Sequence, residues 1–164
     1  MMVSLVMPVL AVSPKSVPAA LFIDTSKVQN TAPEKMWITK GGIVHQQGII
    51  RTVDYDPITP DTTLTIGEET YVAKIHAIVD VTINTKTTKM INHYHKWTIT
   101  LPAQEGLSEE GTFVGTNIWT LSTEPSLSFI GHGVLQGTGA FEGTTLKLSA
   151  EFPPSFAFTG YLLP

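Results

Sequence analysis

The sequence of 164 residues contains no cysteine. This absence excludes disulfide bonds, thiolate metal ligands and a cysteine nucleophile. Charged residues are also scarce: they make up 15% of the chain, against about a quarter in typical globular proteins. The formal net charge is -4 and no basic cluster is present, so we expect no binding to nucleic acid or to an anionic membrane.

Long apolar runs and helical patterns are missing as well. A membrane-spanning helix needs about 20 apolar residues, so we expect no transmembrane span in the mature chain. No segment of helical length repeats its apolar residues at a period of 3.6, and no unit recurs at a fixed spacing, which argues against repeat architectures. The length and the 42% hydrophobic content fit one domain with a core of its own.

The N-terminus has the outline of a secretory signal peptide. An apolar stretch runs from Val3 to Val12 and is followed by small residues at Val17 and Ala19, a pattern typical of a signal peptide and its cleavage site. We therefore predict a signal peptide over residues 1–19, and a secreted or cell-envelope protein. No Lys or Arg precedes the apolar stretch, so a buried N-terminal strand in a cytoplasmic protein is the alternative.

The rest of the chain is expected to begin with a linker or N-terminal arm over residues 20–35, followed by the folded domain over residues 36–164. Alternation of apolar and polar residues predicts a strand from Tyr71 to Asn84. A second strand is predicted from Lys89 to Leu101, where Pro102 ends it. The short polar connection between the two indicates an antiparallel hairpin.

Further strands are expected within residues 36–55, 111–122, 127–141, 144–152 and 156–163. Glycines should bend or bulge the first of these. Six to eight strands with glycine bends in one domain favour an antiparallel β-barrel, closed or nearly so, because closure removes exposed strand edges. A two-sheet β-sandwich is the alternative fold.

One segment carries a family resemblance. Residues 137–144, "GTGAFEGT", resemble the strand-turn-strand signature G-x-G-x-F-x-G of allene oxide cyclase-like and dirigent-like barrels. Glycines there permit tight bends, and Phe141 would fill the barrel end. The resemblance implies a barrel and, because those families form trimers, a homo-oligomer. It leaves the activity open, since barrel folds host unrelated functions.

Two histidines stand out in "INHYHKW". Alternation places His93 and His95 on the same, largely apolar, face as Ile91 and Trp97. A buried imidazole needs a hydrogen-bond partner or a metal. The pair is therefore a hydrogen-bonded feature of the core, a ligand-contacting or acid/base pair, or two ligands of a zinc-type site. A cupin-like metal pattern is absent, because the first Glu after the pair is Glu105.

His132, flanked by glycines, and Glu142 are expected at the mouth of the barrel. With His93, His95 and Trp97 they form the candidate ligand-binding set; no catalytic residue and no metal ligand is assigned. No nucleophile elbow, phosphate loop or dinucleotide signature is present, so no cofactor is expected.

The sequence favours a secreted β-barrel that binds a small apolar molecule, and leaves open whether the protein is an enzyme. The alternatives are a lyase or isomerase that uses His93, His95 and a carboxylate, and a metal-dependent enzyme built on the same pair.

Overall fold

The structure is a computed structural model that describes residues 15–54, 58, 61–87, 89–122, 128–152 and 157–164. These residues form twelve β-strands and one short 3-10 helix, η1 (Thr25–Lys27). The strands are β1 (Val17–Ile23), β2 (Gln29–Asn30), β3 (Lys35–Thr39), β4 (Ile43–Val53), β5 (Thr62–Ile66), β6 (Glu69–Val72), β7 (Lys74–Asn84), β8 (Lys89–Leu101), β9 (Gly111–Ser122), β10 (Ser128–Gly139), β11 (Thr145–Phe152) and β12 (Phe158–Leu163). No helix among the described residues is long and apolar enough to cross a membrane.

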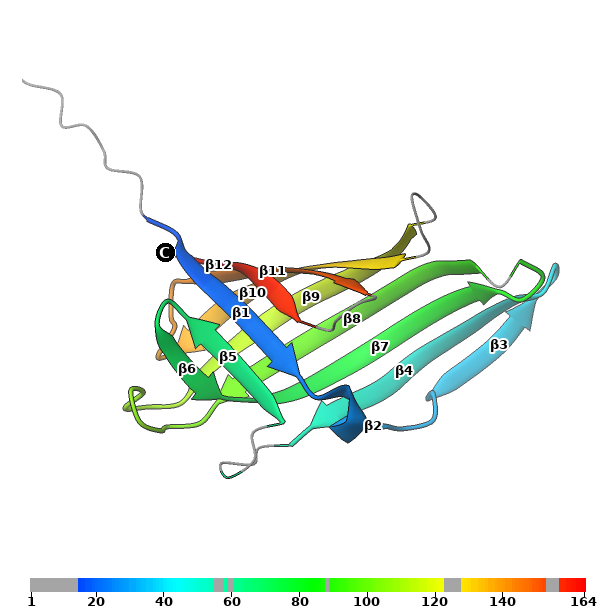
Figure 1. Cartoon of the computed structure of the whole chain (residues 1–164). Helices are drawn as coiled ribbons and strands as arrows, with labels where there is room; N and C mark the ends of the chain where they lie inside the picture. Colours follow the sequence, from blue (N-terminus) through cyan, green and yellow to red (C-terminus); the bar gives the residue numbers. More distant parts are fainter. Residues whose placement is uncertain (1–14, 55–57, 59–60, 88, 123–127, 153–156) are drawn as a thin grey trace, which may run out of the picture.

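All twelve strands belong to one antiparallel sheet. Its order is β2-β4-β7-β8-β9-β10-β11-β12-β1-β5-β6, and β3 pairs with β4 beside this path. The sheet curls strongly into a half-barrel, which brings β1 and β12 over the interior side of β7 and β8 (Figure 1). The predicted antiparallel, all-β barrel class is confirmed. The strand count exceeds the predicted six to eight, because short strands such as β2, β5 and β6 complete the sheet.

The predicted central hairpin is confirmed as β7 and β8, which pair from Lys74↔Thr100 to Asn84↔Lys89. The predicted start of its first strand is wrong, because Tyr71 and Val72 belong to β6 and β7 begins at Lys74. Alternate residues of β7 face the interior, and Ala77 and Val79 are among the buried ones. The alternation of apolar and polar residues in the sequence thus becomes the inner and outer faces of the sheet.

A β-bulge changes one expected orientation on β8. Thr82 pairs with Asn92, but Ile83 pairs with Met90, so Ile91 has no partner on β7. The extra residue reverses which residues of β8 face inward and which face outward on the N-terminal side of the bulge. Ile91 is therefore 56% exposed, and Met90 lines the interior instead. The prediction that Ile91 shares the face of His93 is wrong for this reason.

The beginning of the described chain differs from the expected linker. Val17–Ile23 is β1, which lies between β12 and β5, and Leu21 is only 1% exposed. Residues 1–14 of the predicted signal peptide lie outside the described residues. A cleavage after Ala19 would remove Val17, Pro18 and Ala19, which form three of the five residue pairs between β1 and β12.

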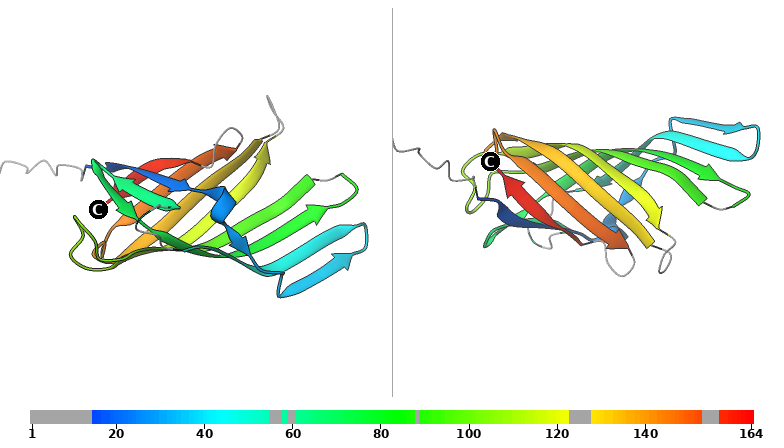
Figure 2. Two further views of the ribbon diagram at one scale, coloured as in Figure 1. Left: turned by 60° about the horizontal axis from the view of Figure 1, so that its bottom comes forward. Right: turned by 90° about the horizontal axis from the view of Figure 1, so that it is seen from above.

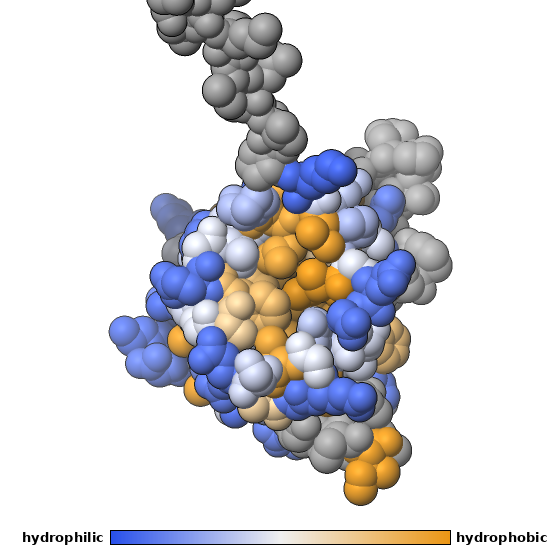
Figure 3. Space-filling model, turned by 90° about the vertical axis from the view of Figure 1, so that its left-hand side faces the viewer, coloured by the Kyte–Doolittle hydropathy of each residue, from blue (hydrophilic) through white to orange (hydrophobic). Residues whose placement is uncertain are grey.

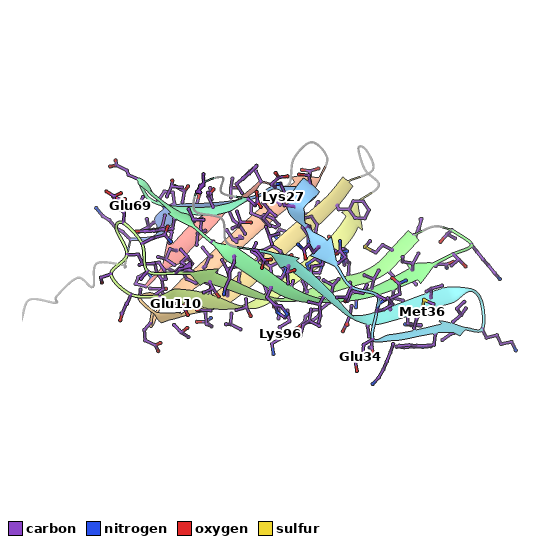
Figure 4. The ribbon with its side chains drawn as sticks, turned by 90° about the horizontal axis from the view of Figure 1, so that it is seen from below. Lys27, Glu34, Met36, Glu69, Lys96 and Glu110 are labelled. Carbon is purple, nitrogen blue, oxygen red and sulfur yellow. The ribbon has the colours of Figure 1, made fainter. Side chains whose placement is uncertain are left out.

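β3 and β4 form a hairpin that extends beyond the curled part of the sheet (Figure 2). A bulge in β4 lies at Gly48, whose φ of 71° favours glycine. The Gly48 N–H donates to the Asp80 carboxylate at 3.0 Å. Met36 (Figure 4) and Ile38 of this hairpin are exposed; Met36 lies on the projecting part. At the opposite end of the molecule, apolar residues gather in the centre and polar residues surround them (Figure 3).

Candidate functional site: a cavity in the half-barrel

A cavity of about 410 Å³ lies inside the curl of the sheet. Residues from η1 and from eight strands on both sides of the curl line it. Its volume is in the range of about 300–1,000 Å³ that small-molecule sites occupy. The lining is mainly apolar and includes the side chains of Ile23, Val28, Ile75, Met90, Phe129 and Phe158.

Aromatic rings form one wall of the cavity. Phe158 of β12 packs edge-on against Trp97 of β8 and Trp119 of β9, with ring centroids 5.1 and 5.7 Å apart. These contacts join strands from opposite sides of the curl. Gly131 of β10 makes room for one of the rings, because a Cβ there would lie 2.9 Å from the indole of Trp119. The wall thus depends on a glycine as well as on the aromatic residues.

Three side chains of β8 form a hydrogen-bonded chain at this wall. The indole Nε1–H of Trp97 donates to Nδ1 of His95 at 2.9 Å. Nε2 of His95 lies 2.7 Å from Nε2 of His93. An indole N–H can only donate, so Nδ1 of His95 is an acceptor and its hydrogen is on Nε2. That hydrogen is donated to Nε2 of His93, which leaves the hydrogen of neutral His93 on Nδ1.

Both imidazoles are held in the neutral form. Burial, with smaller contributions from the charges of His93 and Arg51, lowers the pKa of His95 to about 2. Burial, followed by the charge of Arg51, lowers the pKa of His93 to about 4. The hydrogen bonds agree with these directions, because a second proton on His93 would place two N–H groups against each other. At neutral pH the pair is uncharged and its tautomers are fixed.

Arg51 is the one cationic residue among the described residues that line the cavity. It lies on β4 opposite Ala77, between the inward-facing Ile49 and Val53. Its Nε atom is buried and has no hydrogen-bond partner among the described residues. Burial lowers the pKa of this guanidinium, which nevertheless stays protonated at any physiological pH. The cavity therefore contains a positive charge that the described side chains do not neutralise.

The structure brings together three of the five predicted site residues. His93, His95 and Trp97 all line the cavity. His132 instead lies exposed on the outer face of β10, with Nδ1 3.1 Å from the Ser149 hydroxyl. Glu142 is exposed in the turn between β10 and β11. Neither of these two belongs to the lining.

The set of candidate site residues predicted from the sequence did not include Arg51, Trp119 and Phe158. A signal for Arg51 was present in the sequence. It is the only arginine in the chain, and it lies two residues from Ile49 and from Val53, on the apolar face of β4. Trp119 and Phe158 lie on predicted strands, where aromatic residues are mostly core and line a pocket only if the barrel leaves a cavity. Their place in a cavity depends on how the sheet curls.

The histidine pair has the geometry of a hydrogen bond. Two nitrogen ligands of a tetrahedral zinc ion would lie about 3.3 Å apart, since each Zn–N bond is about 2.0–2.1 Å, whereas the two Nε2 atoms are 2.7 Å apart. Within the described part of the chain, no group of three His, Asp, Glu or Cys side chains could hold a metal ion. The arrangement supplies one cation, the Nδ1–H of His93 and mainly apolar walls, and Thr25, Asn30 and Thr52 are further polar residues of the lining.

No protein-family model matches the chain, and no match is found among curated proteins or among solved structures. The resemblance of residues 137–144 to allene oxide cyclase-like and dirigent-like barrels therefore stays a prediction. The site has to be interpreted from its own geometry.

Proposed function

We propose that this protein binds a small, mainly apolar molecule inside the half-barrel. The observation that carries the proposal is the cavity of about 410 Å³ with its apolar lining and its wall of Trp97, Trp119 and Phe158. Apolar cavities with a few convergent polar groups are the usual form of small-molecule sites. Aromatic walls suit such a ligand because they offer a large contact area with few rotatable bonds.

Binding is favoured over catalysis by what surrounds the histidines. No Asp or Glu is found among the described residues that line the cavity, so a lyase or isomerase would have to move its proton through His93. Nε2 of His93 already accepts a hydrogen bond from His95, and its low pKa makes it a weak base.

Titration with the neutral fluorophore N-phenyl-1-naphthylamine tests the proposal. Saturable binding at one site per chain, with quenching of tryptophan emission, is the expected result. Ala77→Leu places a larger side chain in the lining and should weaken binding at least tenfold. Ala20→Leu makes the same change at an exposed position of β1 and should leave binding unchanged. No saturable binding by the parent protein would overturn the proposal.

We also propose that the protein is exported and that it forms a homo-oligomer, as the sequence predicts. A cleavage before Val17 would leave β1 whole, whereas a cleavage after Ala19 would shorten it. The intact mass of the protein isolated from its own cells or medium tests export and the cleavage that accompanies it. Sedimentation velocity tests whether the protein forms a homo-oligomer.

A further inference from the structure

We infer that the ligand of this cavity carries one carboxylate, which the guanidinium of Arg51 and the Nδ1–H of His93 bind together. This inference rests on the proposed binding function and names the chemical class of the ligand.

The first support is the direction of the hydrogen-bonded chain. Trp97 donates to His95, and His95 donates to His93. Each donor fixes the tautomer of the next ring, so the chain ends in an N–H at Nδ1 of His93. No acceptor for this N–H is found among the described residues, and His93 lines the cavity. A neutral imidazole held this way can only donate to a ligand.

The second support is the charge of Arg51. Its guanidinium lines the same cavity, and its charge acts on both histidines. In the described part of the chain no carboxylate pairs with it, and its buried Nε lacks a partner. The Arg51 side chain is partly buried, and burial of an unpaired cation is costly. A ligand that brings a negative charge removes this cost, whereas a neutral ligand leaves it in place.

The number of cations in the described lining decides which anion fits. A guanidinium matches a carboxylate with two parallel N–H···O bonds, and the Nδ1–H of His93 adds one more donor from the neighbouring wall. A phosphate monoester carries a charge near -2 and more acceptor oxygens, and the described lining offers a single cation for it. The apolar remainder of the lining then accommodates the rest of the molecule. A monocarboxylic acid with a hydrocarbon body fits both parts.

Competition between two probes of equal chain length tests the inference. Decanoate and 1-decanol are used to displace N-phenyl-1-naphthylamine at pH 7.4, where the acid is ionised. Decanoate should displace the fluorophore at a concentration at least tenfold lower than 1-decanol. Arg51→Met should abolish this preference, and Arg51→Lys, which keeps the charge but not the planar donors, should reduce it.

Lys96→Met is the matched control, because it removes one positive charge at an exposed position of β8 (Figure 4). The preference for decanoate should persist in this variant. Binding of the fluorophore with equal competition by the two probes, or with competition by neither, would overturn the carboxylate while leaving the proposed function intact. A preference for decanoate that survives in Arg51→Met would overturn the assignment to Arg51. Failure of the fluorophore itself to bind would overturn the proposed function.

Discussion

His95, which is only 5% exposed, has a hydrogen-bond partner at each ring nitrogen. Nδ1 accepts from Trp97 and Nε2 donates to His93. Its neighbour Asn117, opposite His95 on β9, is fully buried. His95 and Asn117 therefore place two buried polar side chains side by side in this part of the core.

The tautomers of His93 and His95 give the sharpest test of the hydrogen-bonded chain. We expect His95 to carry its hydrogen on Nε2 and His93 to carry its hydrogen on Nδ1, because Trp97 supplies the first donor of the chain. Long-range proton–nitrogen correlation spectra at pH 7 distinguish the two forms. Trp97→Phe removes the donor and should release the constraint on both rings. A parent spectrum with His93 protonated on Nε2 would contradict the hydrogen-bond direction.

The pH dependence of stability follows from the same pair. Both folded-state pKa values, about 4 for His93 and about 2 for His95, are below the unfolded value of about 6.5. Below pH 6.5 the unfolded chain therefore binds protons that the folded protein does not. The free energy of unfolding should fall by up to about 1.4 kcal/mol per pH unit for each histidine as the pH drops from 6.5 toward 4.

Urea denaturation at pH 7, 6 and 5 measures this slope. The double variant His93→Gln, His95→Gln should show a flatter dependence than the parent. Phe158→Leu changes the same cavity without removing a titratable group, so it should lower stability by a similar amount at each pH. Equal slopes for the parent and the double variant would refute the expected proton linkage.

At the scale of elements, close contact between β9 and β10 depends on glycine. A Cβ at Gly115 would overlap the carbonyl oxygen of Val134 and lie 2.6 Å from Cα of Leu135. At Gly133 the nearest atom, Leu135 Cδ1, would be at an ordinary 3.4 Å. Gly115→Ala should therefore cost about 3 kcal/mol of unfolding free energy, and Gly133→Ala less than about 1 kcal/mol. Thermal denaturation of the two variants compares them, and similar losses would contradict the steric account.

Among the elements, long alternating strands are what sequence patterns predict well. β8 and β9 have the predicted limits, because a long alternating strand between turn residues has few competing structures. Residues 17–23 were harder to assign from the sequence, because small residues at alternate positions fit both a signal-peptide cleavage site and a strand. The strand Thr62–Ile66 is short and rich in threonine, so its pattern alone did not separate it from a loop. Ile91 was misplaced because a bulge leaves no mark in the sequence.

At the scale of the whole molecule, stability is expected to be uneven. β3 pairs only with β4, and all of its side chains are exposed, whereas β8 and β9 are paired on both sides. Local opening of β3 should therefore require less free energy than opening of the central strands. Hydrogen exchange at pH 7 should be at least a hundredfold faster for the β3 amides than for those of β8 and β9. Equal protection would show that the projecting hairpin is as stable as the curled sheet.

The candidate site is formed by strands from across the whole molecule, which limits how much of it could be predicted from the sequence. The grouping of His93, His95 and Trp97 follows from alternation within one strand. Arg51 reaches the same cavity because β4 is two strands away in the sheet, and Phe158 because the sheet curls back on itself. These are tertiary relations, and strand periodicity carries no information about them.

Arg51 has a further consequence for chemical labelling. Because the chain contains no other arginine, a guanidinium-selective reagent such as phenylglyoxal has a single target, and that target lines the cavity. An occupied cavity would shield this side chain, and an empty one would leave it open to the reagent. The mass of the labelled protein would then report, in an unpurified extract, the fraction of molecules that already hold their ligand.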